Sequence, residues 1–409
     1  EEVVGTKSAR AVITFSEDGN PLTSTTTNYK KDGITPIDQV VASFGGVEFD
    51  DENNIVGGEL VQTTSRMSLV DGEEVVGTKS SRAVITFSED GNPLTSTTTN
   101  YKKDGITPID QVVASFGGVE FDDENNIVGG ELVQTTSRMS LVDGEEVVGT
   151  KSSRAVITFS EDGNPLTSTT TNYKKDGVTP IDQVVASFGG VEFDDENNIV
   201  GGELVQTTSR MSLVDGEEVV GTKSARAVIT FSEDGNPLIS TTTNYKKDGI
   251  TPIDQVVASF SGVEFDDENN IVGGELVQTT SRMSLVDGEE VVGTKSARAV
   301  ITFSEDGNPL TSTTTNYKKD GVTPIDQVVA SFGGVEFDDE NNIVGGELVQ
   351  TTSRMSLVDG EEVVGTKSAR AVITFSEDGN PLTSTTTNYK KDGVTPIDQV
   401  VASFGGVEF

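Results

Sequence analysis

The chain has 409 residues and a formal net charge of −38, and it contains no cysteine, no histidine and no tryptophan. These absences exclude disulfides, thiolate nucleophiles and cysteine-rich zinc sites, and they remove the usual general base near neutral pH. A polyanion of this kind repels nucleic acids and anionic membrane surfaces, so we expect no nucleic-acid partner and no membrane insertion in this segment.

A repeat of 72 residues organises the whole chain. The string EEVVGTKS begins at residues 1, 73, 145, 217, 289 and 361. The predicted units are therefore 1–72, 73–144, 145–216, 217–288 and 289–360, followed by a partial unit at 361–409. Such near-identity indicates either a recent duplication or a copy number that is itself useful, as in a spacer. Because the chain starts and stops within the repeat, we expect it to be a window onto a longer polypeptide.

The first half of each unit predicts strands joined by tight turns. In the first unit, a short strand at 3–4 precedes an alternating strand over 10–15. The Asp-Gly pair at 18–19 is a strong hairpin signal, and the threonine-rich segment 22–29 is predicted to be the return strand. Lys30–Gly33 is a second predicted turn.

Residues 35–46 are the one segment predicted to be a helix. Thr35 can cap it, Pro36 suits its first position, and Asp38 completes a capping pattern. The apolar positions fall on one stripe of a helix: Ile37, Val40, Val41 and Phe44. A strand is the alternative, because two β-branched valines are adjacent there.

The second half of the unit predicts β structure again. Strands are expected over 47–49, 55–64 and 66–70, with a bulge or bend at the glycine pair 57–58. Turns are expected at 50–54 and at 71–72. The predicted fold is thus mainly β, a β-rich α+β class. We expect a linear array of 72-residue repeats, each with about five or six short antiparallel strands and one short helix.

The acidic turns are the best candidates for chemistry. Carboxylates are the hard oxygen ligands that Ca²⁺ prefers, so these residues are candidate Ca²⁺ ligands at the junctions between units. The alternative is that they are solvated turn residues, since neither EF-hand spacing nor a nonapeptide Ca²⁺ repeat is present. No other cofactor is predicted. The candidates are Asp18, Asp50, Asp51, Glu52, Asp122, Asp123, Glu124, Asp194, Asp195 and Glu196.

No catalytic residue is predicted, and we expect the chain not to be an enzyme. Paired carboxylates can hydrolyse glycosides, but here they lie in turns, and no tryptophan is available to hold a sugar. Neither a nucleophile elbow nor a phosphate-binding loop occurs in the sequence.

Near-identical tandem β units that are acidic and free of cysteine and tryptophan resemble the repeat regions of giant bacterial surface adhesins and of extracellular appendage proteins. The runs FSEDGNPL and FDDENNIVGG also resemble turn-rich β segments of flagellar hook-type proteins. The resemblance implies an extracellular stalk at the cell surface, which projects or connects a binding tip away from the cell. Its expected partners are the neighbouring repeats and other copies of the same chain.

Two alternatives stay open at this point. In the first, several chains bundle into a homo-oligomeric, hook- or grappling-type appendage filament, since lateral packing would supply burial that small units lack. In the second, each unit is a module of a multivalent polysaccharide-binding protein, whose affinity would rise with the number of units.

Overall fold

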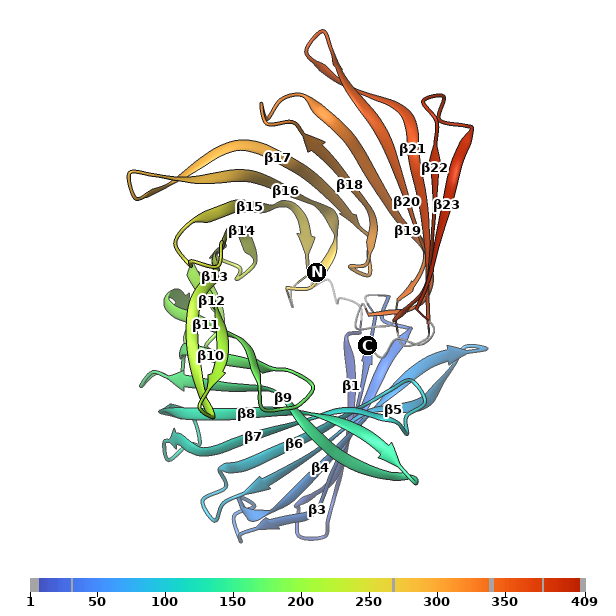
Figure 1. Cartoon of the computed structure of the whole chain (residues 1–409). Helices are drawn as coiled ribbons and strands as arrows, with labels where there is room; N and C mark the ends of the chain where they lie inside the picture. Colours follow the sequence, from blue (N-terminus) through green and yellow to red (C-terminus); the bar gives the residue numbers. More distant parts are fainter. Residues whose placement is uncertain (1–6, 31, 267–268, 338–341, 377–378, 405–409) are drawn as a thin grey trace, which may run out of the picture. The chain divides into compact units, whose positions relative to one another are not determined.

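A computed structural model describes residues 7–30, 32–266, 269–337, 342–376 and 379–404. Within these ranges every regular element is a β-strand, and there are 23 of them. The chain divides into two units, one of residues 1–187 with 210–221 and one of residues 188–209 with 222–409. Figure 1 draws the strands in chain order.

The strand bounds recur with the sequence repeat, and among the described residues each of the five complete repeats holds four strands and the partial repeat holds three. The strands are β1 (Ala9–Phe15), β2 (Pro21–Tyr29), β3 (Pro36–Phe49), β4 (Ile55–Val70), β5 (Glu73–Phe87), β6 (Pro93–Tyr101), β7 (Pro108–Phe121), β8 (Ile127–Val142), β9 (Glu145–Phe159), β10 (Pro165–Tyr173), β11 (Pro180–Phe193), β12 (Ile199–Val214), β13 (Glu217–Phe231), β14 (Pro237–Tyr245), β15 (Pro252–Phe265), β16 (Ile271–Val286), β17 (Glu289–Phe303), β18 (Pro309–Tyr317), β19 (Pro324–Phe337), β20 (Ile343–Val358), β21 (Glu361–Phe375), β22 (Pro381–Tyr389) and β23 (Pro396–Ser403).

Each unit is an antiparallel meander, in which a strand pairs with the strands before and after it in the chain. In the first of these two structural units, not to be confused with the 72-residue repeat, the ladder runs from β1 to β11. In the second unit it runs from β13 to β23. The hydrogen-bonded ladder continues across the repeat boundary. There β4 pairs with β5, from Val70 opposite Glu73 to Glu59 opposite Thr86.

The sheet is a single layer within each unit. Every contact between described strands joins a strand to its chain neighbour or to the next strand but one, so no second layer covers either face. The chain accordingly exposes 22908 Å², whereas a compact monomer of its mass exposes about 15,000 Å². Burial comes from neighbouring side chains in the same layer, as at Tyr101, Ala114 and Leu132.

The predicted helix at 35–46 is wrong, because this segment is the start of β3. Val40 pairs with Thr26 on one side and with Thr64 on the other, so both flanking strands supply main-chain hydrogen bonds. Asp32 accepts hydrogen bonds from the main chain and hydroxyl of Thr35, which makes that threonine part of a turn. The stripe of apolar residues fits a helix and a strand equally well, and the neighbouring strands decide the outcome.

The predicted five or six short strands are also wrong, because four longer strands fill each repeat. β5, β6, β7 and β8 have 15, 9, 14 and 16 residues. The segments predicted as separate strands at 55–64 and 66–70 form the single strand β4. The turn prediction at 71–72 is confirmed, because Asp71 and Gly72 both have positive φ and form a two-residue hairpin loop.

The bulge predicted at the glycine pair 57–58 is confirmed as well, and it recurs in the following repeats. In β8, Gly129 and Gly130 have φ of 151° and 86°, and the register with β7 shifts beside them. A Cβ atom on Gly130 would lie 2.1 Å from the main-chain oxygen of Gly118, so only glycine fits this close approach.

Candidate functional site

The turns divide between two edges of the sheet, which differ in chemistry. Successive turns of a meander lie at opposite edges. We call one the acidic edge: in the second repeat it holds the turns 88–92 and 122–126, with sequences SEDGN and DDENN. We call the other the hairpin edge: it holds the turn 102–107, with sequence KKDGIT, and the two-residue loop 143–144. The acidic edge therefore carries five acids and no base per repeat.

The DDENN turn uses its first carboxylate to hold itself together. Asp122 accepts hydrogen bonds from the main-chain N–H of Glu124 (3.1 Å) and Asn126 (2.7 Å) and from the Asn126 amide (3.1 Å). The bonds from Asn126 lower the pKa of Asp122 below its usual 3.8. Asp50 and Asp194 make the same contacts in their own repeats. Three of the candidate Ca²⁺ ligands, Asp50, Asp122 and Asp194, therefore use their carboxylates to stabilise their own turns.

The SEDGN turn directs its acidic side chains outward. Ser88 and Asn92 close the turn, through a main-chain bond of 2.8 Å and a 3.1 Å bond from the Asn92 N–H to the Ser88 hydroxyl. A Cβ on Gly91 would lie 2.5 Å from the main-chain oxygen of Ile55, so the turn rests directly on the start of β4. Glu89 and Asp90 are exposed at its tip.

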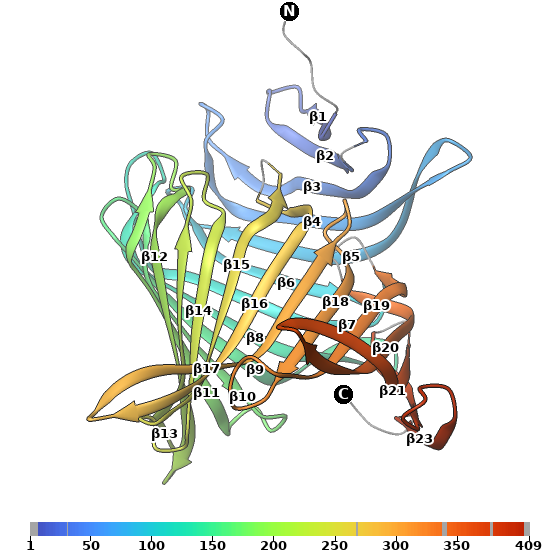
Figure 2. The ribbon, with the colours of Figure 1, turned by 90° about the horizontal axis from the view of Figure 1, so that it is seen from above.

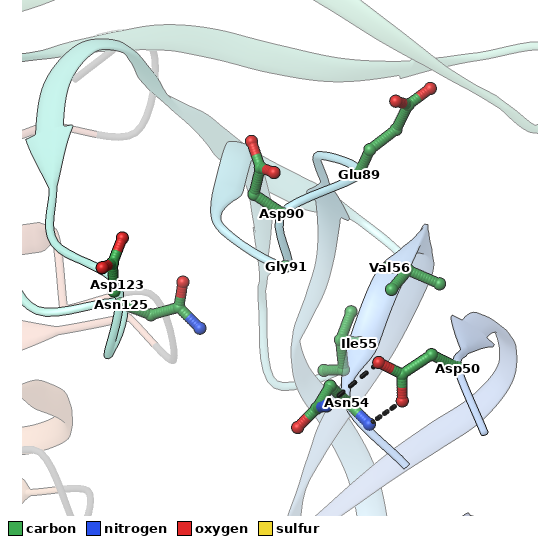
Figure 3. Close-up of a pocket in the computed structure, with 9 residues that line it drawn as sticks. All are labelled: Asp50, Asn54, Ile55, Val56, Glu89, Asp90, Gly91, Asp123 and Asn125. Atoms are coloured by element: carbon green, nitrogen blue, oxygen red, sulfur yellow. Dashed lines mark hydrogen bonds between the residues drawn. The ribbon is translucent and has the colours of Figure 1, made fainter. Parts of the chain in front are cut away.

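Turns from two repeats form an open groove of about 460 Å³ at the acidic edge (Figure 3). In this view Asp50 is bonded to Asn54, while Glu89 and Asp90 come from the neighbouring turn and Asp123 from the next one. No aromatic side chain lines the groove, so it offers no stacking platform for a sugar. The lining residues are Asp50, Asn54, Ile55, Val56, Glu89, Asp90, Gly91, Asp123 and Asn125.

The structure brings some of the predicted Ca²⁺ ligands together and leaves others apart. Asp50 and Asp123 share the groove with Asp90, which is the counterpart of Asp18 in the second repeat. The lining includes neither Asp51 and Glu52 nor Asp122 and Glu124. Asp195 and Glu196 lie in the equivalent DDENN turn that Asp194 closes. Among the described residues, no three or more acids are grouped closely enough to hold a metal ion.

An arginine at the hairpin edge joins consecutive repeats, and sequence reasoning missed it. Arg66 ends the part of β4 that pairs with β3, and its guanidinium donates to three main-chain oxygens of the next repeat. The acceptors are those of Lys79 (3.0 Å), Tyr101 (3.2 Å) and Lys102 (3.3 Å). Arg138, Arg282 and Arg354 make the same clamp. A single arginine in an alternating strand gives no signal that would have predicted it.

A second contact, between a lysine and a glutamate, crosses the boundaries after the first three repeats. The Lys79 Nζ lies 3.4 Å from the centre of the Tyr101 ring and 3.9 Å from the carboxylate of Glu146 in the following repeat. In the first repeat, the Tyr29 hydroxyl donates to Glu74 at 2.8 Å. Burial and the neighbouring Glu146 raise the pKa of Tyr101 to about 12, so its hydroxyl stays a donor at any physiological pH.

Neither a family model nor a curated protein matches the chain. Among solved structures, the chain is similar to one titled "Crystal Structure of TcdB2-TccC3-Cdc42", with 10% identity and a TM-score of 0.16. The match covers 92% of this chain but only 26% of the other. At this TM-score the similarity carries no argument about fold or activity. Over the described residues, no helix is long and apolar enough to span a bilayer.

Proposed function

We propose that this chain is a structural repeat region of a long extracellular fibre or adhesin stalk at the cell surface. The observation that supports it most is the joint between repeats. At position 72 the β4–β5 ladder continues, and the Arg66 clamp and the contacts of Tyr29 with Glu74 cross the same boundary. A connection of this kind passes load from one repeat to the next, and it is repeated with the sequence.

The remaining features agree with a structural role. Carboxylates of the acidic edge close their own turns, and the groove there has no aromatic residue or metal-ligand group among the described residues. The proposal therefore assigns no catalytic residue. The filament of several chains is the second candidate, because a single-layer sheet leaves both faces open to lateral packing.

The proposal predicts that the length of the particle depends on the number of repeats. Four strands about 4.8 Å apart give each repeat a rise of roughly 19 Å across the sheet. Electron microscopy of arrays with three, six and twelve repeats should show threads whose contour length grows in proportion. Particles whose length does not change with repeat number would contradict the proposal. Antibody labelling of intact cells of the source organism tests the surface location.

A further inference from the structure

The hairpin edge is shaped like a comb. Strands β8 and β9 extend beyond their neighbours, because β7 pairs with β8 only as far as Arg138, and β9 pairs with β10 only from Ser153. The hairpin tip beyond Arg138, which we call a tooth, consists of Met139–Val142 and of Glu145–Val148, the residues of β9 that pair with them. Each arm projects by about four residues, roughly 14 Å. The β4–β5 and β16–β17 hairpins project in the same way, as Figure 2 shows.

The gap between two teeth has the width of one tooth. Between the teeth β4–β5 and β8–β9 lie β6 and β7, which pair with each other and turn back at residues 102–107. The gap is thus two strands wide, about 10 Å, and so is a hairpin. The teeth β16–β17 and β20–β21 of the second unit enclose an equal gap over β18 and β19.

The edges of a tooth are open to strand pairing. In an antiparallel pair every second residue directs its N–H and C=O away from the partner strand. Among the described residues, no ladder partner lies beside the outer edge of Met139–Val142. This segment has no charge and no proline, the devices by which edge strands usually prevent pairing. Leu141 and Val142 are exposed.

Tip and floor of the comb are complementary in charge. The tip carries Asp143 and Glu145, both exposed. The floor of the gap is the 102–107 turn, whose two lysines and one aspartate give a net charge of +1. It presents Lys103 and the 64% exposed side chain of Ile106, while the Asp104 carboxylate accepts the N–H groups of its own turn. The same turn is fixed in place, since the Thr78 hydroxyl donates to the Lys103 main-chain oxygen at 2.7 Å. An acidic tip that enters the gap therefore meets a positive charge and an apolar side chain.

We propose that a second copy of this chain binds at the hairpin edge, with its teeth inserted into the gaps of the first. A two-fold axis normal to the sheet makes every new strand pair antiparallel, with β8 against the equivalent arm of the other copy. In the register that opposes Met139 to Val142, only uncharged residues face each other along this arm.

A second copy is the partner that these observations favour. Only a partner with teeth at the same spacing, roughly 19 Å, fills successive gaps within one unit at once, and each added tooth multiplies the affinity. At the acidic edge the five acids per repeat repel another copy of a chain with net charge −38. The single layer also exposes about 8,000 Å² more than a compact monomer would, which exceeds what a stable dimer buries.

The first test places a lysine on every tooth and compares it with the same change at the other edge. The tooth variant carries Leu→Lys at positions 69, 141, 213, 285 and 357, and the control carries Leu→Lys at 94, 166, 238, 310 and 382. Both sets start from partly exposed leucines, 36% for Leu141 and 44% for Leu94, and both add the same charge. Sedimentation equilibrium measures self-association of the wild-type chain and of each variant.

We expect the wild-type chain and the control to associate, and the tooth variant to bind itself at least ten-fold more weakly. A wild-type chain that stays monomeric up to about 100 μM, or a control weakened as much as the tooth variant, would overturn the proposal. The inference deepens the filament form of the proposed function, yet the two fail separately. If the chain is monomeric but still forms threads whose length grows with the number of repeats, only the proposed pairing of teeth is contradicted.

A charge-reversal set tests the contact of tip with floor without changing Met139–Val142 or its counterparts, the arm proposed to pair. One variant changes Glu to Lys at 73, 145, 217, 289 and 361, and another changes Lys to Glu at 103, 175, 247, 319 and 391. Each alone should weaken association, and the combined variant should restore it. A combined variant no better than the single ones would contradict the contact.

Discussion

The acidic edge and the hairpin edge are built from the same chain, yet they manage their polar groups in opposite ways. At the acidic edge, Asp122 and its counterparts bind the N–H groups of their own turn, so each turn is closed on itself. At the hairpin edge, Arg138 reaches into the next repeat and binds the main-chain oxygens of Tyr173 and Lys151. The difference teaches that the side-chain hydrogen bonds between repeats gather at the hairpin edge, while the acidic edge presents charge to solvent.

The largest expected effect is a loss of unfolding free energy on replacing a glycine near the acidic edge. A glycine at the hairpin edge serves as the comparison. Gly130 lies in the bulge near the acidic edge, where a Cβ would lie 2.1 Å from a main-chain oxygen. Gly144 also has positive φ, but no atom lies within 4 Å of its Cβ position. We expect Gly130→Ala to cost about 3 kcal/mol in unfolding free energy and Gly144→Ala about 1. Urea unfolding measures both, and equal costs would show that the close approach is unimportant.

The next effect tests the clamp of the hairpin edge. Arg138→Ala removes the donor to three main-chain oxygens, whereas Arg154 is an exposed residue of the same type in the neighbouring strand. Loss of the clamp should cost about 2 kcal/mol, because it removes charged hydrogen bonds, and Arg154→Ala should cost under about 0.5. If the two variants unfold at the same urea concentration, the clamp does not join the repeats.

Acid should loosen the turns of the hairpin edge. The Thr107 hydroxyl and the main-chain N–H groups of Thr107 and Ile106 hold the pKa of Asp104 at about 2, below the ordinary 3.8. A carboxyl whose folded pKa is depressed contributes stability above its unfolded pKa, and this is lost as pH falls from about 4 to 2. The wild-type urea midpoint should therefore fall between pH 5 and pH 2.

A matched pair of variants isolates this acid effect. Asp→Asn at 104, 176, 248 and 320 should reduce the pH dependence of the urea midpoint, since no carboxylate is left to protonate there. Asp→Asn at 90, 162, 234 and 306 removes the same number of acids from the other edge. An identical pH dependence in the two variants would contradict the assignment.

The smallest effect concerns calcium. The Ca²⁺ site predicted from the acidic turns stays a prediction, and the structure uses the carboxylates of Asp50, Asp122 and Asp194 within their turns. We therefore expect millimolar Ca²⁺ to raise the melting temperature by less than about 2 °C over a chelator. A larger rise, abolished by Asp→Asn at 123, would establish a metal site in the acidic groove.

The turns could be predicted from the sequence, because their chemistry is local. An Asp-Gly pair needs no distant partner to favour positive φ, and the loop at 71–72 formed as expected. The segment 35–46 was mispredicted, because its apolar spacing suits both a helix and a strand and its neighbours supply the ladder. The Arg66 clamp was missed because its acceptors are main-chain oxygens up to 36 residues away, which leave no pattern in the sequence.

The repeat-number dependence of stability tests the central claim, that consecutive repeats within a unit share one sheet, most directly. In such an array each repeat is stabilised by its neighbours, so the urea midpoint should rise from one to three to six repeats, and a single 72-residue unit should be largely unfolded. Equal midpoints for one, three and six repeats would show that the units are independent domains and would contradict the account.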